Sequence, residues 1–523
     1  MKQLAAVSTS TEGRRPTVPW AGFPDFMGTP YLREPRERNG TVPLESRMPM
    51  DQSLPFDLST RQMEELSDEV VKRLLRHIAS VGELPAGGAI DAGVAQRCLE
   101  LPRDAPEKGA PLGPVLDKFF EEWLPASLLT TGPGWLAYIS GGGLFTGALG
   151  HFIGAALSRQ TGLNTQAPFL VELEGRAMGW LRAWMGFPKG ATGIFTPGGS
   201  TSNLIAIITA REHRLGCDIR AGTLYVSEDV HHSILKSARL AGIAADRIRT
   251  IAVDARRRML VEDLQDAIAS DRVSGLRPFL VVSTAGTTNT GAVDPLARIG
   301  EVARREGLWH HVDGAYGGVF RMVPELRPAL AGIETADSLT LDPHKGLFLP
   351  FGTGALLVRD ERTLRAVHTA TASYLPDLPP DEHYDPSQIS PELSRPYRGF
   401  PLWLAVQAHG ASAFREALAE KRALAVFAAQ RLAATPGIAV VDDPQLSIMT
   451  FRATAEGWSR DEEDLQTRAL LDAVNSRGRV HLSGAMVSGR FVGRICVLCF
   501  RVGRQRLEEG LEIIAQERSM LGA

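Results

Sequence analysis

Lys345, within Ser338-Leu-Thr-Leu-Asp-Pro-His-Lys-Gly-Leu-Phe348, is the residue whose type most strongly suggests chemistry. Lysine is scarce in this chain, with only 8 of the 57 basic residues, and this one follows His344 where an expected strand passes into a loop. A primary amine can lose its proton near neutral pH and attack an aldehyde, whereas a guanidinium cannot. Our first hypothesis is therefore that Lys345 is a Schiff-base lysine for pyridoxal 5'-phosphate.

A segment rich in glycine and hydroxyl groups, Thr196-Pro-Gly-Gly-Ser-Thr-Ser-Asn203, separates an expected strand from an expected helix over 204–215. Glycine lets the backbone approach an anion closely, and the first turn of a helix offers free N–H groups. The hydroxyls of Ser200 and Thr201 add further donors. The segment suits a phosphate group, although a plain turn and helix start would have the same composition.

The stretch Trp309-His-His-Val-Asp-Gly-Ala-Tyr316 brings Asp313 to the carboxyl end of an expected strand, the edge at which open α/β sheets bind ligands. A buried aspartate there can pair with a pyridinium N–H and keep that ring an electron sink. Alternation puts His311 and Asp313 on one strand face, so a metal site is the competing interpretation. Because no further ligand cluster stands close by in sequence, we expect no metal.

His231 and His232 stand at the start of an expected helix, in Ser227-Glu-Asp-Val-His-His-Ser-Ile-Leu-Lys236. A neutral imidazole can stack on a pyridine ring, which would make one of them functional. A polar helix start exposed to water is the alternative, and this segment alone leaves both interpretations open.

The composition limits the class of protein. With 523 residues, 44% of them hydrophobic, the chain can form two or three domains around substantial cores. A formal charge of -3 argues against binding to nucleic acid or to a membrane surface. The sequence has no run of about 18 uncharged apolar residues, and residues 1–30 lack the pattern of a signal peptide. We expect a cytoplasmic protein.

The 4 cysteines are too few and too scattered for a disulfide framework. Cys496 and Cys499 have the spacing of a redox or zinc pair, but they lie in an apolar run, 491–502, that is typical of a buried strand. We therefore expect reduced thiols with a structural role.

The elements that must position these residues follow a recognisable order. Residues 1–56 are expected to form a partly disordered arm and 57–144 a helical segment, with a helix from 57 to 77 capped by Ser59 or Thr60. Over 145–402, apolar runs alternate with amphipathic stretches, which predicts a mostly parallel sheet covered on both faces. Strands are expected at 193–196, 223–227, 279–283, 308–313, 338–341 and 354–358.

Two further regions complete the domain plan. The proline-rich stretch 372–398 interrupts the alternation and is expected to be a mobile catalytic loop within the large domain. Residues 403–523 begin with a helix to 435 and then mix short strands with helices, 461–476 and 506–516, as a small C-terminal α+β domain would.

Taken in order, a phosphate loop, a histidine, a strand-end aspartate and a His-Lys pair are similar to the parts of fold-type I pyridoxal-phosphate enzymes. The chain resembles the group II amino-acid decarboxylases, the family of glutamate, aromatic amino acid and histidine decarboxylases. The resemblance runs from about residue 58 to the C-terminus. It includes Ala137-Tyr-Ile-Ser-Gly-Gly-Gly143, Gly286-Thr-Thr288, His311-Val-Asp-Gly-Ala-Tyr316, Asp342-Pro-His-Lys345 and the strands between His481 and Arg501.

The resemblance implies a role for each matching residue. Lys345 resembles the Schiff-base lysine, and His344 its neighbour on the phosphate side. Asp313 is similar in place to the partner of the pyridine nitrogen, Ala315 to the small residue under the ring and Thr288 to a threonine near the cofactor.

The remaining matches concern the phosphate, the ring face and the loop. Gly199, Ser200 and Thr201 resemble the phosphate cradle. His231 matches the histidine that stacks on the ring. Tyr384 resembles the loop tyrosine that reprotonates the substrate carbon, and Tyr374 is left open as the alternative.

Two departures from the family pattern matter. Asp342 stands where many members have asparagine, and a carboxylate would repel a phosphate, so we assign it no phosphate contact. Gly141-Gly-Gly143 replaces a bulkier stretch of the aromatic enzymes, while Asn164-Thr-Gln-Ala-Pro168 is spaced more like the glutamate enzymes. The substrate therefore stays unnamed.

The implied activity is decarboxylation of an L-amino acid to its amine and CO2, in a homodimer whose subunits share their active sites. Two alternatives remain at this point. The same cofactor can give an aldehyde by oxidative deamination, an outcome associated in the family with changes at the loop tyrosine or the stacking histidine. The fold can also carry a non-catalytic or metal-binding protein, with His311 and Asp313 as ligands.

Overall fold

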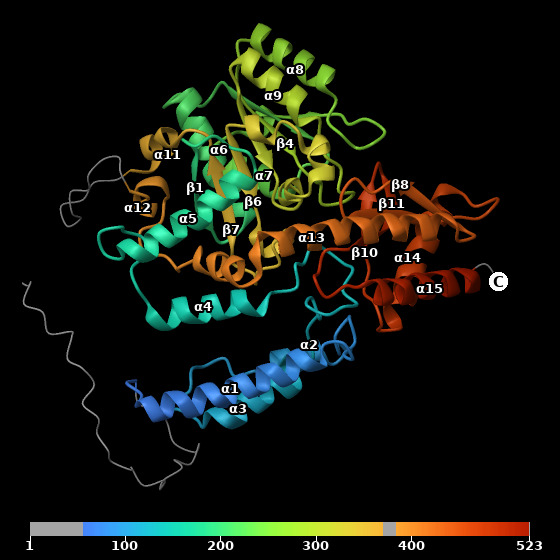
Figure 1. The fold of residues 1–523 in the computed structure, drawn as a ribbon. Coiled ribbons are helices and arrows are strands. Elements are labelled where there is room, and N and C mark those ends of the chain that lie inside the picture. Colours follow the sequence, from blue (N-terminus) through green and yellow to red (C-terminus); the bar gives the residue numbers. More distant parts are fainter. Residues whose placement is uncertain (1–55, 370–382, 522–523) are drawn as a thin grey trace, which may run out of the picture. The chain divides into compact units, whose positions relative to one another are not determined.

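The computed structural model describes residues 56–369 and 383–521 (Figure 1). These residues belong to one compact unit, 53–523. The expected N-terminal arm, apart from its last residue, and positions 372–382 of the expected loop lie outside the described residues. The boundaries expected for the arm, the helical segment and the two domains stay predictions.

A seven-stranded sheet runs in the order β1-β7-β6-β5-β4-β2-β3. Only β7 opposes its neighbours, since β1 and β6 both pair with it in antiparallel fashion and the other pairs are parallel. The strands are β1 (Thr192–Thr196), β2 (Gly222–Ser227), β3 (Ile248–Ile251), β4 (Arg277–Thr284), β5 (Trp309–Asp313), β6 (Ser338–Leu341) and β7 (Gly354–Val358). The mostly parallel sheet and its six expected strands are confirmed, each within about two residues.

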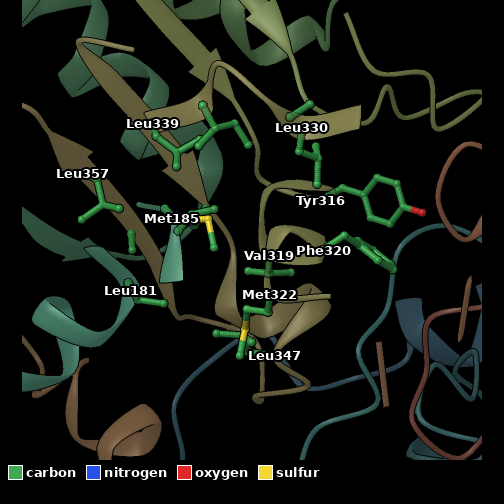
Figure 2. Packing of buried hydrophobic residues seen from close by; sticks show 14 of the residues in the cluster. Leu181, Met185, Tyr316, Val319, Phe320, Met322, Leu330, Leu339, Leu347 and Leu357 are labelled. Carbon is green, nitrogen blue, oxygen red and sulfur yellow. The ribbon is translucent and has the colours of Figure 1, made fainter. Parts of the chain in front are cut away.

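Both faces of this sheet are buried, as its apolar strands require. In β7, Leu356 and Val358 join an apolar cluster that contains Ile205 of α6, whereas Ala355 and Leu357 join another that contains Leu181 of α5. Figure 2 shows part of the second cluster. The sheet therefore lies between two layers of helices.

The helices that precede, connect or follow these strands are α4 (Phe145–Leu157), α5 (Pro168–Trp184), α6 (Gly199–Leu215), α7 (His232–Leu240), α8 (Val261–Val273), α9 (Leu296–Glu306), α10 (Pro343–Gly346), α11 (Glu361–His368) and α12 (Pro386–Ile389). Short 3-10 turns lie at Ala245–Arg247, Gly318–Met322, Pro324–Leu326, Pro328–Leu330 and Ile333–Thr335. Among the described residues, no helix is long and apolar enough to cross a membrane.

A second, antiparallel sheet occupies the C-terminal part, in the order β10-β11-β9-β8. Its strands are β8 (Ile438–Asp442), β9 (Ile448–Ala453), β10 (Ser483–Val487) and β11 (Arg490–Cys496). The helices α13 (Phe400–Ala433), α14 (Arg460–Ser476) and α15 (Arg504–Met520) pack with it around an apolar core. Cys496 and Cys499 are both buried, and all 4 cysteines are free, as expected for structural thiols.

The N-terminal helices are α1 (Thr60–Ser80), α2 (Val94–Leu99) and α3 (Leu112–Lys118), followed by a π-helical turn, η1 (Phe119–Trp123). Ser59 caps α1, because its hydroxyl accepts from the backbone of Gln62. An ion pair of 2.5 Å between Arg73 and Asp117 joins α1 to α3, which lie side by side in Figure 1. No residue of α1 is buried.

Candidate active site

The predicted site residues converge on one cavity of about 390 Å³ at the carboxyl ends of the parallel strands. It is lined by Pro197, Gly198, Gly199, Ser200, Thr201, Asn203, His231, Ser233, Thr284, Gly286, Thr288, Asp313, Ala315, Tyr316, Asp342, His344 and Lys345. Every predicted site residue except Tyr384 is among them. Segments that follow β1, β2, β4, β5 and β6 supply these side chains.

Lys345 lies on the single turn α10, directly after β6. Its Nζ is 2.9 Å from Oδ2 of Asp342, whose side chain is almost fully buried. The other carboxylate oxygen of Asp342 is buried and has no hydrogen-bond partner within 56–369 and 383–521. The amine is therefore held by a carboxylate that also faces the cavity.

His344 is fixed beside this pair. Its Nδ1 lies 2.8 Å from the carbonyl oxygen of Thr353, so Nδ1 carries the proton and donates. Burial lowers the pKa of His344, and this effect outweighs the attraction of Asp342. The His344 ring is therefore neutral at neutral pH.

Asp313 is held by donors on both of its carboxylate oxygens. Oδ1 accepts from the backbone N–H of Ala315 at 3.1 Å, and Oδ2 accepts from Nδ2 of Asn203 at 3.0 Å. The side chain is nearly buried, with 5% of the residue exposed. A carboxylate has room for more than two donors, so Asp313 can still accept an N–H from a ring in the cavity.

The phosphate loop leaves no free space for a side chain at Gly199. A Cβ atom on Gly199 would lie 2.9 Å from Oδ2 of Asp342 and 3.2 Å from Cβ of Ala315. Gly199 is also the first residue of α6, a helix of 17 residues, so the first turn of this helix faces the cavity. The backbone there can approach a phosphate as closely as the sequence predicts.

His231 caps α7 and lines the cavity. Its Nδ1 lies 2.8 Å from Oγ of Ser233. Burial lowers the pKa of His231, and the nearby Asp313 carboxylate opposes that shift. The histidine is thus not the solvent-exposed helix start that the sequence left open.

The hydrogen bonds that His311 makes argue against the metal interpretation. Nδ1 of His311 lies 2.8 Å from Oγ of Ser338, and Nε2 lies 3.0 Å from Oδ1 of Asn203. Both ring nitrogens are thus engaged, and burial lowers the pKa of this histidine to about 4. No group of three or more potential metal ligands occurs in the part of the chain that the structure describes.

The structure corrects the prediction for Tyr384. Its side chain packs against Gly175 of α5 and beside an apolar cluster, and it does not line the cavity. The hydroxyl is buried without a hydrogen-bond partner among the described residues. Burial also raises the pKa of Tyr384 well above its usual value, so this hydroxyl is poorly placed to exchange a proton. Tyr374, the alternative, lies outside the described residues.

Sequence reasoning missed three residues. Asn203 and Ser233 line the cavity and bond the predicted residues Asp313 and His231. Arg494 donates to the carbonyl oxygen of Thr288 at 2.9 Å and is 3% exposed. An arginine inside an otherwise apolar strand was a signal for Arg494. Nothing in the sequence distinguished Asn203 or Ser233 from ordinary cap residues.

The parts present fit pyridoxal phosphate. An amine, a strand-end carboxylate and a glycine-lined helix start surround one cavity, and these are the groups that an aldehyde, a pyridine nitrogen and a phosphate require. Together with the mostly parallel sheet between helix layers, they define a fold-type I pyridoxal-phosphate enzyme.

Comparison with known proteins narrows this class. Residues 96–454 match the model of the pyridoxal-dependent decarboxylase conserved domain. An aromatic-L-amino-acid decarboxylase of Bacillus atrophaeus is 29% identical over 468 residues, 89% of this chain and 96% of the relative. A 4-hydroxyphenylacetaldehyde synthase of Rhodiola rosea is 30% identical over 430 residues, 80% of this chain and 87% of the relative.

A solved structure agrees with the sequence comparison. The tryptophan decarboxylase of Catharanthus roseus in complex with L-tryptophan superposes with a TM-score of 0.83 at 25% identity, over 89% of this chain and all of that one. The chain therefore belongs to the pyridoxal-dependent decarboxylase family. Its cofactor is pyridoxal phosphate, and its reaction is decarboxylation of an amino acid.

Proposed function

We propose that the cavity around Lys345 is the active site, in which an L-amino acid loses CO2 to give its amine. The observation that carries this proposal is the convergence of the Lys345 amine, the Asp313 carboxylate and the start of α6 on one cavity. When bound, the cofactor supplies a ring that accepts the electrons of the breaking bond at the substrate's α-carbon.

The side chains divide the work of holding that ring. Lys345 attaches the cofactor, and Asp313 keeps a proton on the pyridine nitrogen. His231 would stack on the ring, Ala315 would leave it room, and Thr288 would lie near it.

The start of α6 would hold the phosphate. Gly199, Ser200 and Thr201 offer it backbone and hydroxyl donors at the start of α6, and His344 lies beside them. Asp342 supplies no donor, which agrees with our assigning it no phosphate contact.

The amine, rather than the aldehyde, is the proposed product. We assign the return of a proton to the α-carbon to the loop residue Tyr374, because the hydroxyl of Tyr384 is buried and does not line the cavity. Both this tyrosine and the stacking histidine, His231, are present in the chain. The similarity to an aldehyde synthase keeps the second outcome as the candidate to test.

We propose an aromatic side chain for the substrate. The relatives that support this are an aromatic-L-amino-acid decarboxylase and a tryptophan decarboxylase, which match most of the chain. The rival is an acidic amino acid, suggested by the spacing around Asn164–Pro168.

The enzyme is proposed to be a cytoplasmic homodimer. Apolar side chains stand exposed on α1 and α4, where a second copy would cover them; they include Met63, Val71, Leu75, Phe152 and Leu157. The 4 free cysteines, two of them exposed, suit a reducing compartment.

The test is a panel of L-amino acids, aromatic and acidic, given to the purified protein with pyridoxal phosphate. We expect CO2 release from an aromatic amino acid with an equal yield of amine and no peroxide. Equal yields of aldehyde and peroxide would favour the second outcome. CO2 release from acidic amino acids alone would contradict the aromatic assignment.

A further inference from the structure

A network of buried polar side chains connects Asp313 to His231 through Asn203. The Asn203 side chain lies on α6 and is 1% exposed. Its single Nδ2 donates to Oδ2 of Asp313 at 3.0 Å and to Oγ of Ser233 at 3.1 Å. One amide group thus uses both of its hydrogens to link a strand-end carboxylate with the helix that carries His231.

The orientation of the Asn203 amide follows from its surroundings. A carboxylate can only accept, so the nitrogen must face Asp313 and Oδ1 must face away. There Oδ1 accepts from Oγ1 of Thr340 at 2.7 Å and lies 3.0 Å from Nε2 of His311. Nε2 must therefore donate, so His311 carries a proton on Nε2. Burial lowers the pKa of His311 to about 4, so the ring is neutral at neutral pH and this is its one proton.

The same reasoning fixes the proton of His231. Oγ of Ser233 already accepts from Asn203, so the hydroxyl hydrogen is available for Nδ1 of His231, 2.8 Å away. The backbone N–H of Ser233 also points at this Nδ1, at 3.4 Å. Since Nδ1 accepts, the neutral ring carries its proton on Nε2, the one nitrogen of His231 left for a ligand.

Charged groups around His231 set how firmly this neutral form is held. Burial lowers its pKa most, and His232 of α7 and Lys345 of α10 lower it further, whereas Asp313 of β5 and Asp342 raise it. Protonation would also require Oγ of Ser233 to accept a second N–H and to turn its own hydrogen elsewhere. The hydrogen-bond network and the burial therefore both favour the neutral form of His231.

We propose that Asn203 and Ser233 are positioning residues that together orient the Asp313 carboxylate and keep the His231 proton on Nε2. The inference rests on the roles proposed above for Asp313 and His231. Because the Asn203 amide bonds Asp313 directly and His231 through Ser233, a change at Asn203 should affect both residues.

The direct test is nitrogen NMR of the cofactor-free protein labelled with 15N-histidine, with His231 assigned by its loss in His231→Gln. We expect a single neutral form with the proton on Nε2. In Ser233→Ala, Nδ1 loses its hydroxyl donor and keeps only the longer contact with the backbone N–H, at 3.4 Å, so both neutral forms should appear and protonation should occur at higher pH. Ser233→Thr, which keeps the hydroxyl, should restore the original spectrum.

Two results would overturn the inference: a proton on Nδ1 in the unaltered protein, or an unchanged spectrum in Ser233→Ala. This readout needs neither substrate nor cofactor. A failed decarboxylation assay would therefore leave this inference untouched. Failure of the proposed function and failure of the inference can thus be told apart.

The proposed effect of Asn203 on Asp313 is tested with 4'-deoxypyridoxine 5'-phosphate, a cofactor analogue that lacks the aldehyde and cannot react with Lys345. Asn203→Leu removes a hydrogen bond to a charged group and should weaken binding by about 10-fold or more. Thr209→Val is the matched control, because it removes a buried hydroxyl on the same helix that lies 3.3 Å from Nε2 of His368 instead and does not line the cavity. Unchanged affinity in a folded Asn203→Leu protein would refute this effect.

Discussion

At the scale of single residues, the surroundings of Asp313 give the clearest indication of its role. Asp313→Asn keeps the size of the side chain but loses the charge that holds a proton on the pyridine nitrogen. We expect the affinity for the aldehyde-free cofactor analogue to fall by roughly 10- to 100-fold, the loss of a charged hydrogen bond. Binding would be measured by calorimetry.

Asp337→Asn is the control for this prediction. Its carboxylate is also largely buried and accepts from the backbone N–H of His310 at 2.8 Å, but it does not line the cavity. Its affinity for the analogue should equal that of the unaltered protein. If both variants bound the analogue equally well, Asp313 would not be the ring partner.

The two tyrosines give a second prediction at this scale. Tyr374→Phe removes the hydroxyl that we expect to protonate the substrate carbon. CO2 release should persist while the amine yield falls and oxygen uptake with aldehyde formation rises. Tyr384→Phe is the matched control, since its buried hydroxyl makes no hydrogen bond within the described residues. An unchanged amine yield in Tyr374→Phe would exclude this tyrosine as the proton donor.

Lys345 and Asp313 were predictable as residues of the cavity, whereas the residues that hydrogen-bond to Asp313 and His231 were not. Few functions other than cofactor binding require the residue types that surround Lys345 and Asp313. Asn203 and Ser233 have the ordinary composition of helix starts, and only the packing of α6 against β5 and β6 gives them partners. The sequence did not indicate that the Tyr384 side chain lies outside the cavity, because the composition of a proline-rich stretch does not show where a side chain points.

At the scale of the elements, a buried ion pair fastens the segment 383–399 to α5. The side chains of Glu174 and Arg395 form a contact in which each is 1% exposed. The carboxylate also accepts from the backbone N–H of Gly399 at 2.9 Å, just before α13. Glu174 is thus the anchor for both the end of this segment and the start of the long helix.

Glu174→Gln should lower the free energy of unfolding by about 3–5 kcal/mol, because it leaves a buried guanidinium without its counter-charge. Glu172→Gln on the same helix is the control. Its pair with Arg176 is exposed, so the expected loss is at most about 1 kcal/mol. Urea unfolding of both variants checks this, and equal losses would show that the buried pair contributes no more than a surface pair.

The strands were predictable where burial dominates the sequence. Residues 279–282 and 354–358 are continuous apolar runs, which strands buried on both faces of the sheet require. β3 was missed because Ile248-Arg-Thr-Ile251 is short and half polar, as suits the edge of the sheet. The start of α6 was placed too late, at 204, because Gly199 and the four hydroxyl or amide residues that follow it favour a loop by propensity.

At the scale of the whole molecule, the exposed apolar side chains of α1 and α4 predict association between copies. Phe152 on α4 is 62% exposed, and so is Leu465 on α14. Phe152→Glu would bury a charge in the proposed interface, whereas Leu465→Glu would place one in water. Only the first should shift sedimentation toward the monomer and make the specific activity fall on dilution. A dimer unaffected by Phe152→Glu would exclude α4 from the interface.

The covalent link at Lys345 is the claim on which the rest depends. Borohydride reduction of the protein loaded with pyridoxal phosphate fixes the cofactor to the amine that holds it, and peptide mass spectrometry locates that amine. We predict the added mass on the peptide of Lys345, at one cofactor per chain, and its loss in Lys345→Arg. Cofactor on Lys421, the buried lysine that donates to the carbonyl oxygen of Val502, or on no lysine, would contradict the account.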